Sequence, residues 1–258
     1  DSPPPSRTMQ CFPDLVVALS CGLVAFGALH LRSEMFKTLQ YGKEEDRQEP
    51  GEEAGKESAK KPPRRHRVHL PTSCAWILME LPSIMVPTFL LVLRHPPRLA
   101  PLGCKLLGGM FCGHYFHRTF IYPFFRRGRP FPLHTVFAGI LFCMFNGFLQ
   151  SYYMIYCAEY PDDWCNDVRF TSGFLLFVLG MGINIHSDFL LRQLRKPGEF
   201  TYKIPQGGLF AYVSSANYFG EILEWFGYAI ATWCLPAFAF AFCTVCILGP
   251  RACQCHRY

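Results

Sequence analysis

The fold class is decided by the stretch Cys74-Ala-Trp-Ile-Leu-Met-Glu-Leu-Pro-Ser-Ile-Met-Val-Pro-Thr-Phe-Leu-Leu-Val-Leu93. It is almost entirely apolar, and its length of about twenty residues lets an α-helix cross a hydrocarbon core of roughly 30 Å. One carboxylic acid, Glu80, interrupts it. An ionisable side chain inside a membrane is costly, so it usually faces a cavity or a partner and marks chemistry. The alternative for Glu80 is a structural hydrogen bond to a neighbouring helix.

Comparable apolar runs recur along the 258 residues, of which 50% are hydrophobic. The predicted spans are Leu15–Leu31, Cys74–Leu93, Leu102–Tyr122, Thr135–Cys157, Phe170–Leu191, Leu209–Trp233 and Leu235–Leu248. An open β-sheet would leave backbone groups unsatisfied in lipid, whereas helices satisfy their own. The sequence therefore predicts an all-α membrane protein, a bundle of about seven transmembrane helices.

The formal net charge of +6 is distributed unevenly over the connections between these runs. Lys and Arg gather in Arg32–His69, in Arg126–Arg129 and in Arg192–Lys203, whereas the connection 158–167 is acidic. Because basic loops are retained in the cytosol, the N-terminus is predicted to be lumenal and the C-terminus cytosolic. Nucleic-acid binding is the weaker interpretation, since the basic stretches flank membrane helices.

Four segments are expected along the chain. Residues 1–14 form an N-terminal tail, and residues 15–43 form the first membrane helix with a cytosolic Tyr-Gly-Lys segment. Residues 44–67 are charged, contain Pro and Gly and have no apolar face to bury, so they are predicted to be a disordered insertion. Residues 68–258 form one helical domain.

The 13 cysteines lie mostly inside apolar runs, where they are interpreted as small hydrophobic residues. A zinc site could be built from Cys243, Cys246, Cys253 and Cys255 together with His256. It is disfavoured because Cys243 and Cys246 lie in a helix of membrane character without a knuckle turn. No metal site is predicted.

Polar residues repeat at helical spacing beside the apolar runs. Asn184 and Asp188 are four residues apart, as are Asn217 and Glu221, so each pair shares a helix face. Basic residues towards the cytosol suit a phosphate-rich anion, because Arg binds phosphate through two donors.

Glu80 and Tyr115 lie deeper in the predicted bundle. A protonated Glu80 beside the Tyr115 hydroxyl would provide two donors that polarise a ketone. The sequence therefore predicts a charged cofactor that enters from the cytosol and an apolar carbonyl substrate that arrives from the lipid.

Several longer stretches of the sequence, in predicted helices and in connections alike, resemble the steroid 5-alpha-reductase family, most closely its type 2 members. The resemblance rests on Ala75-Trp-Ile-Leu-Met-Glu-Leu-Pro-Ser83, His114-Tyr-Phe-His-Arg-Thr-Phe-Ile-Tyr122, Asn146-Gly147, Leu149-Gln150, Tyr156-Cys-Ala-Glu-Tyr-Pro161, Gly182-Ile-Asn-Ile-His-Ser-Asp188, Leu191-Arg-Gln-Leu-Arg-Lys-Pro-Gly-Glu199, Tyr202-Lys-Ile-Pro-Gln-Gly-Gly-Leu-Phe210 and Ala216-Asn-Tyr-Phe-Gly-Glu-Ile-Leu-Glu-Trp225. It covers nearly the whole chain from Met9 onward, except the insertion 44–67.

The resemblance implies a multi-pass enzyme of the endoplasmic reticulum that reduces the 4,5 double bond of 3-oxo-4-ene steroids, such as testosterone, with NADPH. It implies that Glu80 and Tyr115 are catalytic and hold the 3-oxo group, with Trp76 and Arg118 beside the substrate. The implied NADPH contacts are Tyr41, Arg127, Arg129, Asn184, Asp188, Arg195, Tyr202, Asn217, Glu221 and Arg251. Hydride would reach C5, and the resulting enolate would be protonated at C4.

Three departures from the family pattern stand out. Met79 occupies a position where the family usually has Gln, Gln254 and Cys255 replace members of a histidine run, and the chain stops at Tyr258 before the tail that the family carries. Two alternatives stay open, the first of them favoured by the missing tail and the second disfavoured by the close type 2 wording. One is a truncated, non-catalytic relative that binds steroid or a partner without turnover, and the other is a reductase of polyprenols or enoyl-CoA.

Overall fold

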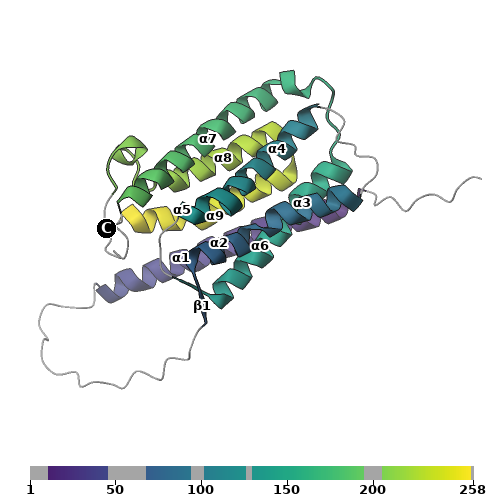
Figure 1. Cartoon of the computed structure of the whole chain (residues 1–258). Coiled ribbons are helices and arrows are strands. Elements are labelled where there is room, and N and C mark those ends of the chain that lie inside the picture. Colours follow the sequence, from purple (N-terminus) through teal and green to yellow (C-terminus); the bar gives the residue numbers. More distant parts are fainter. Residues whose placement is uncertain (1–10, 46–67, 94–101, 126–129, 195–204, 257–258) are drawn as a thin grey trace, which may run out of the picture.

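A computed structural model describes residues 11–45, 68–93, 102–125, 130–194 and 205–256. In these residues the chain forms seven helical rods that lie side by side and run in alternate directions (Figure 1). The rods are α1 (Pro13–Glu45); α2 (Thr72–Glu80) with α3 (Pro82–Leu93); α4 (Leu102–Phe116) with the π-helical η1 (His117–Ile121) and α5 (Tyr122–Phe125); α6 (Leu133–Tyr152) with the π-helical η2 (Tyr153–Cys157); α7 (Val168–Gln193); α8 (Ala216–Thr232); and α9 (Leu235–His256). The predicted all-α membrane fold is confirmed.

Short non-helical elements join the rods. β1 (His69–Leu70) and β2 (Phe131–Pro132) pair antiparallel, with His69 opposite Pro132. This pairing holds the starts of α2 and α6 together, so the two helices leave the same end of the bundle side by side. Two 3-10 turns, η3 (Trp164–Asn166) and η4 (Gly208–Ala211), precede α7 and α8.

Five of the described segments are long and apolar enough to cross a membrane: Pro13–Phe36, Thr72–Leu93, Leu133–Cys157, Val168–Gln193 and Leu235–Cys255. The rod that begins with α4 and the 17-residue helix α8 are not among these five, and both carry ionisable side chains in the interior. His114, Arg118 and Glu224 are all buried. Polar groups at membrane depth are expected to face a bundle interior or a cavity, so these two rods form the inner wall of the site.

Three helix boundaries differ from the sequence prediction. The helix predicted over Leu209–Trp233 begins only at Ala216, because the chain first makes the 3-10 turn η4 and Ser215, with φ of −130° and ψ of 58°, is not helical. The last helix runs past Leu248 to His256, since Pro250 removes only one backbone donor. The first continues to Glu45, so Glu44 and Glu45 are helical; the rest of the predicted insertion lies outside the described residues.

Glycines bring α7 and α8 into direct backbone contact. A Cβ added at Gly220 would lie 2.6 Å from the backbone nitrogen of Asn184, and one added at Gly180 would collide with the backbone nitrogen of Glu224. Gly173 and Gly227 repeat this contact two turns along each helix. The two helices run alongside each other in Figure 1. Small residues allow such close packing of membrane helices, and here the packing sets Asn184 against the first turn of α8.

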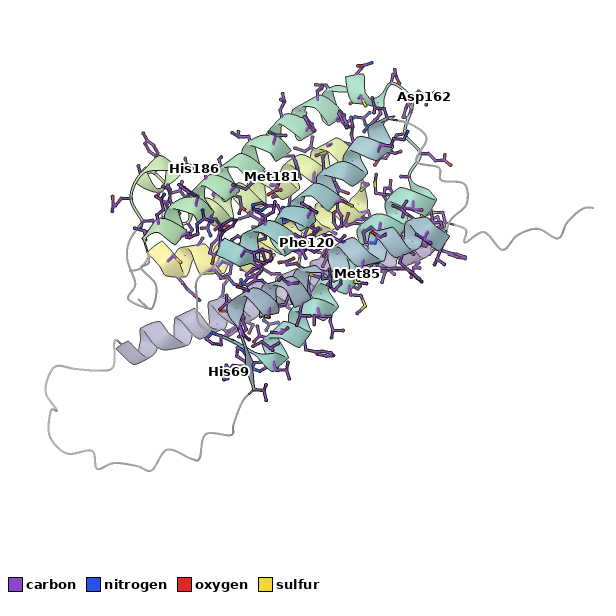
Figure 2. All side chains as sticks on the ribbon, in the orientation of Figure 1. His69, Met85, Phe120, Asp162, Met181 and His186 are labelled. Atoms are coloured by element: carbon purple, nitrogen blue, oxygen red, sulfur yellow. A yellow bond between two sulfur atoms is a disulfide. The ribbon has the colours of Figure 1, made fainter. Side chains whose placement is uncertain are left out.

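A disulfide joins Cys11, just before α1, to Cys157 at the end of η2. The interpretation of the cysteines as small hydrophobic residues holds for buried ones such as Cys104 and Cys246 but is wrong for this pair. The bond lies at the bundle end that carries the acidic connection. Figure 2 shows Asp162 of that connection and His69 at opposite ends of the bundle.

Candidate active site

The helices enclose a cavity of about 800 Å³. Its lining includes most of the residues singled out from the sequence: Trp76, Glu80, Tyr115, Arg118, Asp188, Asn217, Glu221 and Arg251. Arg127, Arg129, Arg195, Tyr202 and the side chain of Tyr41 lie outside the described residues. The cavity therefore gathers side chains from α2, α4, η1, α7, α8 and α9, which are far apart in sequence.

Arg118 is the buried cation at the centre of this wall. Its Nη2 lies 3.4 Å from Glu221 Oε2 and its Nη1 lies 3.7 Å from Asp188 Oδ2. The guanidinium also stacks on the rings of Trp76 and Tyr122, with its central carbon 4.9 and 4.7 Å from the ring centroids. Arg118 belongs to η1, and π-helical turns of this kind occur frequently at functional sites.

The α7–α8 contact carries two linked amide bonds. Asn184 Nδ2 donates to the backbone carbonyl of Asn217 at 2.9 Å, and Asn217 Nδ2 donates to Asp188 Oδ1 at 3.4 Å. Asn184 is buried behind Asn217 and does not line the cavity, whereas Asp188 and Asn217 do. The predicted pairs therefore meet across the two helices, with Asn184 placed to hold Asn217 rather than to reach a ligand.

Glu80 and Tyr115 both line the cavity, and each has a polar neighbour. Glu80 closes α2 immediately before the break at Pro82, and its Oε2 accepts a hydrogen bond from the Cys143 thiol at 3.6 Å. The Tyr115 hydroxyl oxygen accepts one from Asn146 Nδ2 at 3.3 Å. The cavity thus brings an acid and a phenol together with Arg118 and its two carboxylates.

Residues 129–258 match the family model described as 3-oxo-5-alpha-steroid 4-dehydrogenase. The type 2 enzyme of Macaca fascicularis is 54% identical over 250 residues, which cover 97% of this chain and 91% of that relative. The human type 2 enzyme is 52% identical over the same coverage, and the human type 1 enzyme is 51% identical over 75% of this chain and 75% of that relative.

The chain belongs to the 3-oxo-5-alpha-steroid 4-dehydrogenase family. It is therefore a member of a family of steroid-metabolising oxidoreductases, and its apolar helices make it a membrane-bound one.

A second buried contact between ionisable side chains lies beside Tyr115. His114 Nδ1 is 2.7 Å from Glu224 Oε1, and the His114 ring packs against Tyr115 and Trp225 with centroids 5.0 and 4.5 Å apart. The sequence analysis assigned no role to Glu224 and did not pair it with His114. The spacing of Glu224 from Glu221 on one helix face was the available signal.

Other residues of the site carried even weaker signals. Asn146 and Gln150 are four residues apart in an apolar run, the same spacing that drew attention to α7 and α8, but they were given no role. Cys143 was interpreted as a small hydrophobic residue, and its thiol contacts Glu80. Within the described part of the chain, no group of three or more His, Cys, Asp or Glu side chains is placed to hold a metal ion.

Proposed function

We propose that this chain reduces the 4,5 double bond of 3-oxo-4-ene steroids, with testosterone as a representative substrate and NADPH as reductant. The observation that carries the proposal is that Glu80 and Tyr115 line one cavity that also contains Arg118. The names of the relatives support the reaction class. The cavity volume of about 800 Å³ lies within the upper part of the range for ligand sites, roughly 300–1,000 Å³.

The apolar part of the cavity lining fits an apolar substrate. Phe26, Phe142, Phe240 and Ile247 contribute rings and aliphatic groups from α1, α6 and α9. Apolar walls with few, well-placed polar groups are typical of small-molecule sites. A rigid steroid ring system would lie against these walls with its ketone towards Glu80 and Tyr115.

The part of the cavity lining at the start of α8 fits a phosphate-bearing cofactor. Ser215 precedes the 17-residue helix α8 and lines the cavity, and its buried hydroxyl has no hydrogen-bond partner among the described residues. A helix N-terminus attracts anions through its free N–H groups. Arg192 and Arg251 also line this cavity. Ser215, the start of α8 and these two arginines would hold the phosphates, with Asp188 and Asn217 contacting the remainder of the cofactor.

NADPH, when bound, supplies the hydride for C5 of the steroid. The protein stabilises the charge that follows. As the double bond is reduced, negative charge develops on the 3-oxo oxygen, and the Tyr115 hydroxyl and the Glu80 acid are the donors available to it. Donors that are already oriented in a site without bulk water stabilise such charge strongly, because they need no reorganisation during the reaction.

The direct test is turnover by the chain in membranes. Membranes that contain it are expected to convert testosterone to the 5α-reduced product with NADPH, measured by chromatography against membranes from untransfected cells.

Asp188→Ala should raise the KM for NADPH about tenfold and change the KM for testosterone little, because removal of a charged hydrogen-bond acceptor costs about 1.5–3 kcal/mol. Absence of product from the unaltered chain would overturn the proposal.

We also propose that the chain resides in the endoplasmic reticulum membrane, with its N-terminus in the lumen and its C-terminus in the cytosol. The basic loops support this orientation. The disulfide between Cys11 and Cys157 supports it independently, because disulfides persist in oxidising compartments such as the lumen and are rare in the cytosol. Both arguments put the connection 158–167 on the lumenal side.

Glycan mapping is expected to report this orientation. An N-glycosylation acceptor introduced at Asp162–Asp163 should be modified in cells, because only lumenal sites meet the transferase. An acceptor introduced within 51–58 should remain unmodified. The measurement is the mobility shift that glycosidase removes, and modification of the second site without the first would reverse the orientation.

A further inference from the structure

Three hydrogen bonds connect the backbone of α9 to the Tyr115 hydroxyl. Gln150 Nε2 donates to the Pro236 carbonyl at 2.9 Å and to Asn146 Oδ1 at 3.2 Å, and Asn146 Nδ2 donates to the Tyr115 oxygen at 3.3 Å. We call Pro236, Gln150 and Asn146 the amide relay. Asn146 and Gln150 are only 0% and 2% exposed, and neither lines the cavity. The relay therefore acts on the site only through Tyr115.

The Pro236 carbonyl sets the direction of every bond in the relay. A carbonyl oxygen accepts and never donates, so the part of the Gln150 amide that faces it must be the NH₂ group. That NH₂ group also faces Asn146, which must present its own oxygen. Asn146 therefore turns its NH₂ group to Tyr115. Reversing Gln150 would set two acceptors against each other, and reversing Asn146 alone would set two donors against each other, in a buried place where an unmade hydrogen bond is costly.

The direction of the relay determines what the Tyr115 hydroxyl can do. Its oxygen accepts from Asn146, so its single hydrogen remains for a different acceptor. Ser83 is the neighbouring hydroxyl, and it donates to the Cys143 carbonyl at 3.4 Å. Tyr115 itself lines the cavity together with Glu80. Because Ser83 donates its own hydrogen, its oxygen can accept the Tyr115 hydrogen when no substrate is bound, and a bound ketone replaces it as the acceptor.

We propose that Asn146 and Gln150 are positioning residues that aim the Tyr115 proton at the 3-oxo oxygen of the substrate. This inference rests on the proposed function. Donation by Asn146 also stabilises the negative charge that builds on the Tyr115 oxygen as its proton is shared with the substrate, because linked hydrogen bonds polarise one another. Gln150 contributes by holding Asn146 in the donating orientation.

Asn146→Leu tests the relay with a side chain of similar shape that cannot donate. It is expected to lower kcat about tenfold and to leave NADPH affinity unchanged, since a lost hydrogen bond is worth up to about one factor of ten in rate. Gln150→Leu should give a smaller loss. Ser151→Ala is the matched control: it removes a buried hydroxyl from the same helix that donates to the Gly147 carbonyl within that helix, and it should retain full kcat.

A double-mutant cycle separates positioning from a merely structural role. In a Tyr115→Phe background, Asn146→Leu should lower kcat no further, because the group through which it acts is gone. The second readout is the ultraviolet absorption of a 3-oxo-4-ene steroid bound with oxidised cofactor, which moves to longer wavelength when donors reach its oxygen. Asn146→Leu should reduce this shift. Multiplicative losses of kcat in the cycle, or an unchanged wavelength shift, would overturn the relay.

A replacement variant and a thermal-unfolding measurement test the relay if Asn146→Leu does not fold or the unaltered chain is inactive. If Asn146→Leu does not fold, Asn146→Ala takes its place in every measurement with the same expectations. If the unaltered chain neither binds nor reduces the steroid, the proposed function fails, and thermal unfolding of the same four proteins then tests the relay alone. Non-additive shifts of Tm between Asn146 and Tyr115 would support the bond, and additive shifts would overturn it.

Discussion

Tyr115→Phe is expected to lower kcat for steroid reduction by about a hundredfold or more, because it removes the donor aimed at the oxygen where negative charge develops. Tyr115 lines the cavity and accepts a hydrogen bond from Asn146, whereas the proposed cofactor contacts are made by other residues, Asp188 and Asn217. The protein should therefore still fold and bind NADPH. Single-turnover reduction of testosterone, followed together with NADPH affinity and Tm, gives the measurement.

Glu80 variants provide the comparison for Tyr115→Phe. Glu80→Gln keeps a donor of similar shape and should retain more activity than Glu80→Ala, which leaves neither a donor nor the acceptor for the Cys143 thiol. Near-normal turnover in both Tyr115→Phe and Glu80→Ala would remove the pair from the mechanism. An equal loss in Glu80→Gln and Glu80→Ala would mean that the acid itself, rather than hydrogen-bond donation, is required.

Gly180→Ala is expected to abolish stable folding or to lower the free energy of unfolding by about 3 kcal/mol or more. The added methyl group would collide with the backbone nitrogen of Glu224, and a backbone cannot move aside as a flexible side chain can. The helices α7 and α8 would have to separate. Separation would break the bond from Asn184 to the Asn217 carbonyl, so residual protein should also bind NADPH weakly.

Gly182→Ala is the matched control on the same helix, because nothing lies within 4 Å of the added methyl group. It should leave Tm unchanged or raise it slightly, since Ala favours a helix more than Gly does. Tm in detergent and the fraction of monodisperse protein measure both variants. A Gly180→Ala protein as stable as Gly182→Ala would contradict the close packing of α7 on α8.

The sequence alone was sufficient for the fold class and for several of the side chains that line the cavity. Long apolar runs can satisfy their backbone in lipid only as helices, so an all-α membrane bundle followed without any tertiary information. Helical spacing also gave the faces of single helices correctly: Asp188 and Asn217 do meet across α7 and α8. Glu80 was found because a carboxylic acid is conspicuous in an apolar run. The family resemblance was confirmed by the relatives.

Tertiary structure alone decided which helix faces which. Periodicity identifies a face of a helix but not the residue that packs opposite, so the contact of Arg118 with Glu221 and the pairing of His114 with Glu224 were not predicted. Helix ends set by local backbone conformation, as at Ser215 before α8, were also missed. The disulfide and the amide relay join residues more than 80 positions apart, from Cys11 to Cys157 and from Gln150 to Pro236. Such contacts depend on the packing of whole helices, and no local pattern in the sequence encodes them.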